Sequence, residues 1–138
     1  MVLGICLSLA AAAAAPVFVP AVDFTLAWTH SIEKQRWEED YRVAYRKGDR
    51  AQTGTSVQLQ AGAARIRGSA AGMEPPAGAR LQDGWYTYQP TPWPDTPLRL
   101  TRSEFTADFD LCIDGRCQSM AHWLTTDGGI TLLSPCAR

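Results

Sequence analysis

The chain has 138 residues, with 13 Lys or Arg against 14 Asp or Glu, so its formal net charge is −1. The basic and acidic residues are interspersed and form no basic stripe, which excludes the electrostatic footprint of a nucleic-acid-binding protein. This length favours one domain, and it is enough for one ordinary hydrophobic core.

The first 21 residues, MVLGICLSLAAAAAAPVFVPA, carry no charged side chain. An apolar stretch followed by small residues is typical of a secretory signal, with cleavage expected after Ala15 or Ala21. Because no Lys or Arg precedes this stretch, two alternatives stay open: the natural start lies upstream, or the segment is retained as an N-terminal anchor. Pro16 and Pro20 make it a poor membrane span. We therefore expect an exported protein, in the periplasm or on the outer face of the cytoplasmic membrane, whose domain covers residues 22–138.

Residues 24–45 alternate between apolar and polar side chains, which predicts two β-strands around a turn at residues 33–36. Such a turn places His30 opposite Glu39. A one-residue slip would turn an apolar row outward, whereas a slip of two residues would keep the faces matched. The same register sets three apolar pairs on the inward face: Phe24 with Tyr45, Leu26 with Val43, and Trp28 with Tyr41.

His30 and Glu39 are the polar positions on this inward face. A half-buried carboxylate is costly without a hydrogen-bond donor, and an imidazole N–H supplies one. The structural interpretation is a pair that closes the hairpin, and it is the favoured one. The functional interpretation is a pocket in which the two residues exchange a proton or orient a ligand.

Residues 67–80, RGSAAGMEPPAGAR, are rich in glycine and proline and cannot form a central strand or a regular helix. Exposed backbone N–H groups in such a segment could cradle an anion, but a tight surface loop is the commoner outcome. The pattern around Ser69 lacks the glycine two positions earlier, so it is not the nucleophile elbow of hydrolases.

Short extended segments separated by turn signals continue to the end of the chain. Asp83-Gly84 predicts a turn before an aromatic strand at residues 85–88, and a proline-rich stretch containing Trp93 follows. About eight short strands and no amphipathic helix favour an all-β fold, a single small antiparallel β-sandwich or open barrel. The extended segments are 24–30, 37–45, 57–66, 85–88, 98–101, 105–113, 116–124 and 130–133.

The cysteines give the most specific local signal. In LCIDGRCQ, Asp114-Gly115 favours a two-residue type I′ turn, which makes Cys112 and Cys117 a non-hydrogen-bonded pair with closely spaced side chains. We predict a disulfide between them, worth about 2 kcal/mol by loop entropy. Cys136 is then left over, because Cys6 falls in the apolar N-terminal segment. A zinc site is disfavoured because C-x4-C differs from the usual C-x2-C spacing, so no metal or cofactor is predicted.

The motifs FTLAWTHSIEKQRWEEDY, RGSAAGMEP and DGWY resemble the bacterial domain-of-unknown-function family 1850. The resemblance extends over nearly all of the chain after the apolar segment. It implies a small exported protein, often encoded beside TAXI-type tripartite ATP-independent periplasmic transporters, and it implies no reaction. Arg36 stands where family members often have proline. The residues that match the family motifs, and that we take as candidate ligand-binding residues, are His30, Ser31, Glu33, Lys34, Glu39, Gly68, Ala71 and Gly72.

Three functions follow as hypotheses. The first is a non-catalytic accessory or ligand-binding module that contacts a small solute and the membrane subunit or solute-binding protein of such a transporter. The second is a small hydrolase-like enzyme that uses His30 and Glu39, although Ser31 points to the opposite face of a regular strand. The third is a structural interaction domain of the envelope that uses Trp93. We favour the first, since the sequence contains no recognisable catalytic set.

Overall fold

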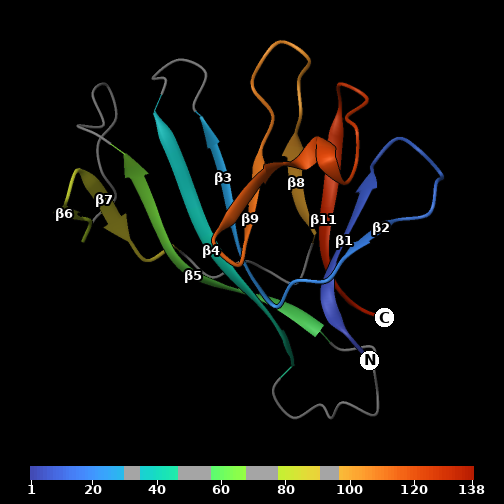
Figure 1. Cartoon of the computed structure of the whole chain (residues 1–138), viewed down its shortest axis with the longest axis horizontal. Coiled ribbons are helices and arrows are strands. Elements are labelled where there is room, and N and C mark those ends of the chain that lie inside the picture. Colours follow the sequence, from blue (N-terminus) through green and yellow to red (C-terminus); the bar gives the residue numbers. More distant parts are fainter. Residues whose placement is uncertain (30–34, 47–56, 68–77, 91–96) are drawn as a thin grey trace.

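The protein, seen as a computed structural model, is built almost entirely from antiparallel β-strands (Figure 1). The structure describes residues 1–29, 35–46, 57–67, 78–90 and 97–138. One turn of 3-10 helix, η2 (Met120–His122), interrupts the strands of this part. The strands are β1 (Leu3–Leu9), β2 (Val17–Val19), β3 (Asp23–Thr29), β4 (Arg36–Tyr45), β5 (Val57–Arg67), β6 (Arg80–Gln82), β7 (Trp85–Tyr88), β8 (Leu98–Thr101), β9 (Asp110–Ile113), β10 (Arg116–Ser119) and β11 (Ile130–Ala137).

The strands form two sheets, one in the order β2-β1-β11-β8 and the other in the order β10-β9-β3-β4-β5-β7-β6. The long strands β4 and β5 join the two, since β4 contacts β1 and β5 contacts β11. In Figure 1 the β5–β7–β6 side of the larger sheet extends away from the four-stranded sheet. The predicted all-β, two-sheet architecture is confirmed, and the described strands do not close into a barrel.

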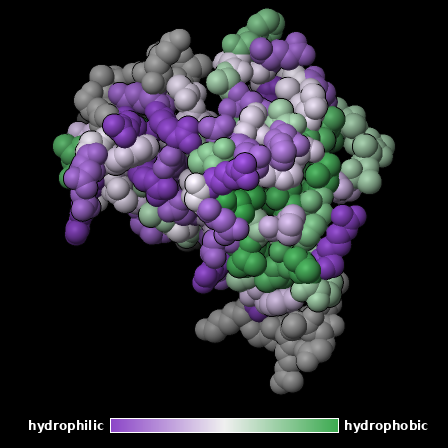
Figure 2. Space-filling view, in the orientation of Figure 1, coloured by the Kyte–Doolittle hydropathy of each residue, from purple (hydrophilic) through white to green (hydrophobic). Residues whose placement is uncertain are grey.

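Apolar side chains between the sheets form the core. Hydrophobic side chains gather over the four-stranded sheet in Figure 2, whereas hydrophilic ones cover the side of β5, β6 and β7. Burial of this apolar surface supplies the main stabilising free energy. The buried cluster comprises Ile5, Leu7, Val19, Ala21, Phe24, Leu26, Tyr41, Val43, Leu98, Leu100, Leu111, Met120 and Leu133.

The apolar N-terminal segment belongs to this core. Strand β1 lies between β2 and β11, and the side chains of Ile5 and Leu7 are completely buried. Cys6 forms a disulfide with Cys136, so the expectation that Cys136 is left over is wrong. Our predicted boundary at residue 22 separated the segment from the domain, yet the structure places two strands of the four-stranded sheet before it. An export role for the segment stays a prediction.

The β3–β4 pairing differs from the predicted register by four residues along β4. Leu26 lies opposite Glu39 rather than Val43, and Trp28 lies opposite Trp37. The predicted pairing of His30 with Glu39 therefore loses its geometric basis, and His30 itself lies outside the described residues. Because four is an even number, the inward and outward faces are still those predicted.

Cross-strand complementarity explains the observed register. Phe24 stacks on Tyr41 with ring centroids 5.5 Å apart, and on the outer face Thr25 donates a 2.7 Å hydrogen bond to Asp40. Aromatic and polar cross-strand pairs each contribute about 0.2–1 kcal/mol, so several together favour one register over another with the same faces.

Both predicted Asp-Gly turns are present. Asp114 and Gly115 have φ of 53° and 76°, as a type I′ turn requires, and Cys112 is the direct partner of Cys117. The predicted Cys112–Cys117 disulfide is confirmed. The two disulfides thus pair Cys112 with Cys117 and Cys136 with Cys6.

A buried ion pair ties the ends of β8 and β11 to the segment before β9. The Arg102 guanidinium, whose side chain is completely buried, donates to both carboxylate oxygens of Asp108 at 2.8 and 2.7 Å. It also donates to Thr131 Oγ1 and to the Leu124 carbonyl. Burial raises the pKa of Asp108, but the hydrogen bonds and the positive charge of Arg102 lower it by more than burial raises it. The net pKa shift of Asp108 is therefore downward. These hydrogen bonds satisfy the donors of the buried guanidinium, so Arg102 has a structural role.

Candidate functional site

Most of the predicted ligand-binding residues fall on segments that the structure does not describe. His30, Ser31, Glu33 and Lys34 precede β4, and Gly68, Ala71 and Gly72 follow β5; all of them, like Trp93, lie outside the described residues. Glu39 is the member of the set that the structure describes, so the site is built from it.

Glu39 projects from β4 on the inner face of the seven-stranded sheet. Side chains alternate along a strand, so Trp37, Glu39 and Tyr41 share this face. On β5, Ala64 is the direct partner of Glu39 and Ile66 is that of Trp37. The pairing places a charged group in an otherwise apolar and aromatic row.

A β-bulge in β5 keeps the inner face continuous. Tyr41 pairs with Ala61 while Glu39 pairs with Ala64, so Gly62 and Ala63 together oppose Asp40. The bulge shifts the inward positions of β5 from odd to even residue numbers, from Leu59 and Ala61 to Ala64 and Ile66. Without it, Ala63 would lie opposite Glu39, and Ala64 and Ile66 would point to the other face.

Glu39 is half-buried and lacks a cationic partner among the described residues. Its Oε1 accepts a 2.9 Å hydrogen bond from Tyr41 Oη. Burial raises the pKa of Glu39, and the Tyr41 hydrogen bond offsets part of that rise. The pKa of Tyr88 is also raised, first by burial and then by the Glu39 charge, which shows that these groups lie within electrostatic reach.

Aromatic rings surround this carboxylate. Trp28 stacks on Trp37 with ring centroids 6.0 Å apart. Tyr86 and Tyr88 of β7 pair with Ile66 and Ala64 of the neighbouring strand β5. All four rings are partly exposed, as is Glu39 itself. We call this side of the sheet the Glu39 face; its partly exposed members are Trp28, Trp37, Glu39, Tyr86 and Tyr88, and its buried members are Ala64 and Ile66.

The outer face of the same strands has a different chemistry. Glu38 accepts from Arg36 and Arg65, each at 2.8 Å, and Asp40 accepts from both terminal nitrogens of Arg65 at 2.9 and 3.0 Å. Arg36 also reaches Asp110 of β9 at 3.2 Å. Acids and arginines satisfy one another here, so this network holds three strands together.

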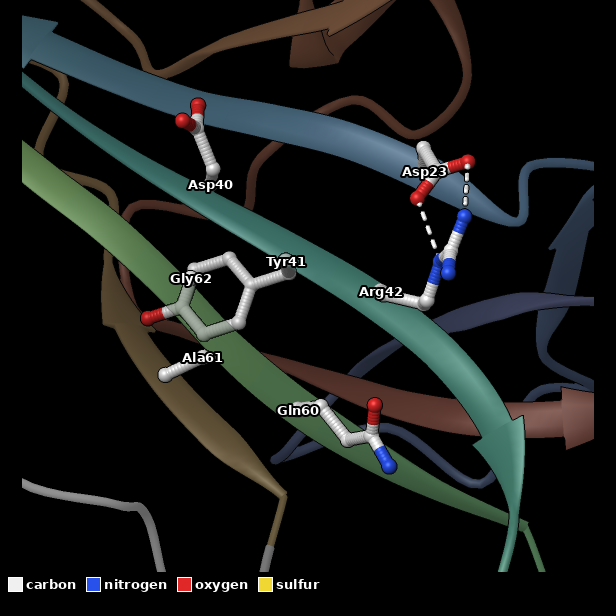
Figure 3. A pocket seen from close by; sticks show the side chains of 7 residues that line it. All are labelled: Asp23, Asp40, Tyr41, Arg42, Gln60, Ala61 and Gly62. Carbon is white, nitrogen blue, oxygen red and sulfur yellow. Dashed lines mark hydrogen bonds and ion pairs between the residues drawn. The ribbon is translucent and has the colours of Figure 1, made fainter.

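A shallow pocket of about 280 Å³ lies on the outer face beside the bulge (Figure 3). Asp23 and Arg42 form an ion pair at one end of it, with Arg42 Nε 2.8 Å from Asp23 Oδ1. The other carboxylate that lines the pocket, Asp40, accepts hydrogen bonds from Arg65 and Thr25. Because these charges are already paired, the pocket is a weaker candidate than the Glu39 face.

The sequence alone did not identify the aromatic partners of Glu39. Tyr86 and Tyr88 were assigned to an aromatic strand, but nothing local indicates that this strand lies beside β5. The alternation of Tyr86 and Tyr88 with Thr87 was the available signal for one aromatic face. Within the described ranges, no group of three or more His, Cys, Asp or Glu is arranged to hold a metal ion.

In the described part of the chain, no helix is long and apolar enough to cross a bilayer. No curated protein and no solved structure matches the chain. A family model described as "Domain of unknown function (DUF1850)" matches residues 24–120, a range that includes every residue of the Glu39 face. The chain therefore belongs to the DUF1850 family.

Proposed function

We propose that this chain is an exported, non-catalytic accessory module that binds a small solute for a TAXI-type tripartite ATP-independent periplasmic transporter. Its contact on that transporter is the membrane subunit or the solute-binding protein. The observation that carries the ligand-binding part is the Glu39 face, where a half-buried carboxylate stands among partly exposed aromatic rings. Small-molecule sites combine mostly apolar walls with a few polar groups that fix orientation.

Two further features support this role. The disulfides Cys6–Cys136 and Cys112–Cys117 suit an oxidising compartment, such as the periplasm, in which cysteines pair stably. Glu39 accepts its hydrogen bond from a tyrosine and contacts no described His, Ser or Cys, which favours binding over catalysis. The association with a transporter rests on the family resemblance.

Uptake by the transporter of the host tests the role. Deletion of the gene is expected to lower the rate of solute uptake, and the wild-type gene is expected to restore it. Glu39→Gln removes the charge from the inner face, and we expect it to restore uptake roughly tenfold less well, which corresponds to about 1.4 kcal/mol of lost binding.

Glu38→Gln is the matched control, because it makes the same chemical change one residue away on the outer face. It is expected to restore uptake, with folding of each variant checked by thermal denaturation. Unchanged uptake and growth after deletion, across all substrates of the transporter, would reject the accessory role.

A further inference from the structure

We propose that the Glu39 face recognises an organic cation, a protonated amine or related cationic nitrogen carried on an apolar or aromatic body. This inference rests on the ligand-binding role proposed above and specifies the class of solute. Three features of the described residues support it: the segregation of charge between the two faces, the free acceptor capacity of Glu39, and the rings around it.

Charge is divided unequally between the faces of β4 and β5. By strand alternation, the described arginines of these strands project on the outer face, where Arg36 and Arg65 pair with acids. The inner face of the same two strands presents the Glu39 carboxylate. An anionic ligand would be repelled there, whereas a cation would supply the missing opposite charge.

The hydrogen bonds of Glu39 leave acceptor sites open. An ionised carboxylate has about four lone-pair sites. Tyr41 Oη fills one of them on Oε1, and no described residue donates to Oε2. A half-buried carboxylate in this state is costly to the fold, and a ligand that donates charged N–H groups offsets that cost.

The surrounding rings favour a cation with an apolar body. Ala64 lies between Glu39 and Tyr88 in the sheet and is completely buried, so the partly exposed neighbours Glu39 and Tyr88 are the side chains that a ligand can contact. Trp28, Trp37 and Tyr86 occupy the next row toward the end of the strands. Aromatic faces attract cations with about 0.5–2 kcal/mol and also pack against apolar groups, so one ligand can use both contacts.

Calorimetric titration with three related probes tests the inference. Phenethylammonium carries the expected cation, 2-phenylethanol is its neutral analogue, and 3-phenylpropionate carries a negative charge. The full-length, disulfide-bonded protein is expected to bind phenethylammonium roughly tenfold more tightly than 2-phenylethanol, and to bind 3-phenylpropionate least. Equal or tighter binding of the alcohol or the carboxylate would overturn the cation assignment.

Variants locate the binding. Glu39→Gln is expected to lower phenethylammonium affinity to that of the alcohol, Tyr88→Leu to weaken it severalfold, and Glu38→Gln to leave it unchanged. Retention of wild-type affinity by Glu39→Gln would also overturn the proposal.

The pH dependence gives a second readout. Among described residues, the titratable side chains that share this face with Glu39 are tyrosines, and a phenol carries no charge in acid. As the pH falls, Glu39 takes up a proton and loses its charge, so phenethylammonium affinity is expected to decline while 2-phenylethanol affinity stays constant. Equal pH dependence for both probes would contradict ion pairing at Glu39.

The calorimetric test of the cation class and the uptake test of the accessory role can fail independently. If Glu39→Gln impairs uptake but phenethylammonium does not bind, the accessory role stands and the cation class is wrong. If phenethylammonium binds through Glu39 but deletion leaves uptake unchanged, the site stands and the transporter role is wrong.

Discussion

Glu39 is expected to reduce the stability of the fold at neutral pH. Its pKa is raised by burial, so between the ordinary carboxyl pKa and this raised value the folded state binds more protons than the unfolded state. Stability then falls as the pH rises through that window, and the penalty is complete above the raised pKa. A buried charge kept at such a cost is typical of a functional residue.

Glu39→Gln is therefore predicted to stabilise the protein by about 0.5–1 kcal/mol at pH 7. The amide oxygen still accepts the hydrogen bond from Tyr41, while the charge is gone. Urea denaturation at pH 7 measures the gain, and repeating it below the raised pKa should show the gain disappear. A loss of stability at pH 7, or a gain independent of pH, would contradict the burial argument.

For individual residues, the sequence predicted those contacts that local backbone geometry determines. The Cys112–Cys117 disulfide followed from Asp114-Gly115, because a two-residue turn fixes the register of its hairpin. Glu39 was identified on an inward face by alternation alone. Tyr88 was not predicted as its neighbour, since that contact depends on a pairing between β5 and β7 that no short-range pattern specifies.

The bulge in β5 is the element that assembles the Glu39 face. Insertion of one alanine after Ala63 is predicted to place the new residue opposite Glu39, which turns Ala64 and Ile66 to the outer face. Exposure of Ile66 alone would cost about 2–3 kcal/mol, so the variant should unfold at much lower urea concentration.

Gly62→Ala is the control for this insertion. A Cβ at Gly62 would lie 3.4 Å from the nearest atoms of Asp40, an acceptable contact, so this variant should keep a near-wild-type urea midpoint. If the insertion variant were as stable as Gly62→Ala, the bulge would not set the orientation of β5.

The hydrophobic pattern could not determine strand register. The predicted and observed registers of β3 and β4 differ by an even number of residues, so both bury the same rows. The difference lies in specific pairs, such as Phe24 with Tyr41 and Asp23 with Arg42. Each of these contacts contributes little free energy, and none can be identified until both strands are placed together.

For the whole molecule, we predict that the mature protein retains residues 1–21. Cleavage after Ala15 or Ala21 would remove β1, expose the apolar edge of β11 and leave Cys136 without its partner. The Cys6–Cys136 disulfide spans 130 positions and contributes up to about 5 kcal/mol by loop entropy, against about 2 kcal/mol for Cys112–Cys117.

Mass spectrometry of a non-reduced digest, with protein isolated from its natural host, checks this prediction. A peptide containing Cys6 linked to one containing Cys136 is expected, together with the internal Cys112–Cys117 link. A mature N-terminus at Pro16 or Val22 would contradict the role of β1.

The apolar composition of this segment suits both a secretory region and a buried strand, because the two use the same residues. The alternation of its side chains was the feature that indicated a strand: Leu3, Ile5 and Leu7 face inward, while smaller residues lie between them. The partner strand β11 lies at the other end of the chain, so no local pattern revealed the pairing.

The central claim is that the Glu39 face holds a small solute, and capture of that solute tests it most directly. Wild-type protein, Glu39→Gln and Glu38→Gln are each incubated with the same envelope extract and re-purified, and the small molecules they release are compared by mass spectrometry. We predict a solute that is enriched by the wild type and by Glu38→Gln and is lost from Glu39→Gln. Identical small-molecule profiles for the wild type and Glu39→Gln would contradict the account.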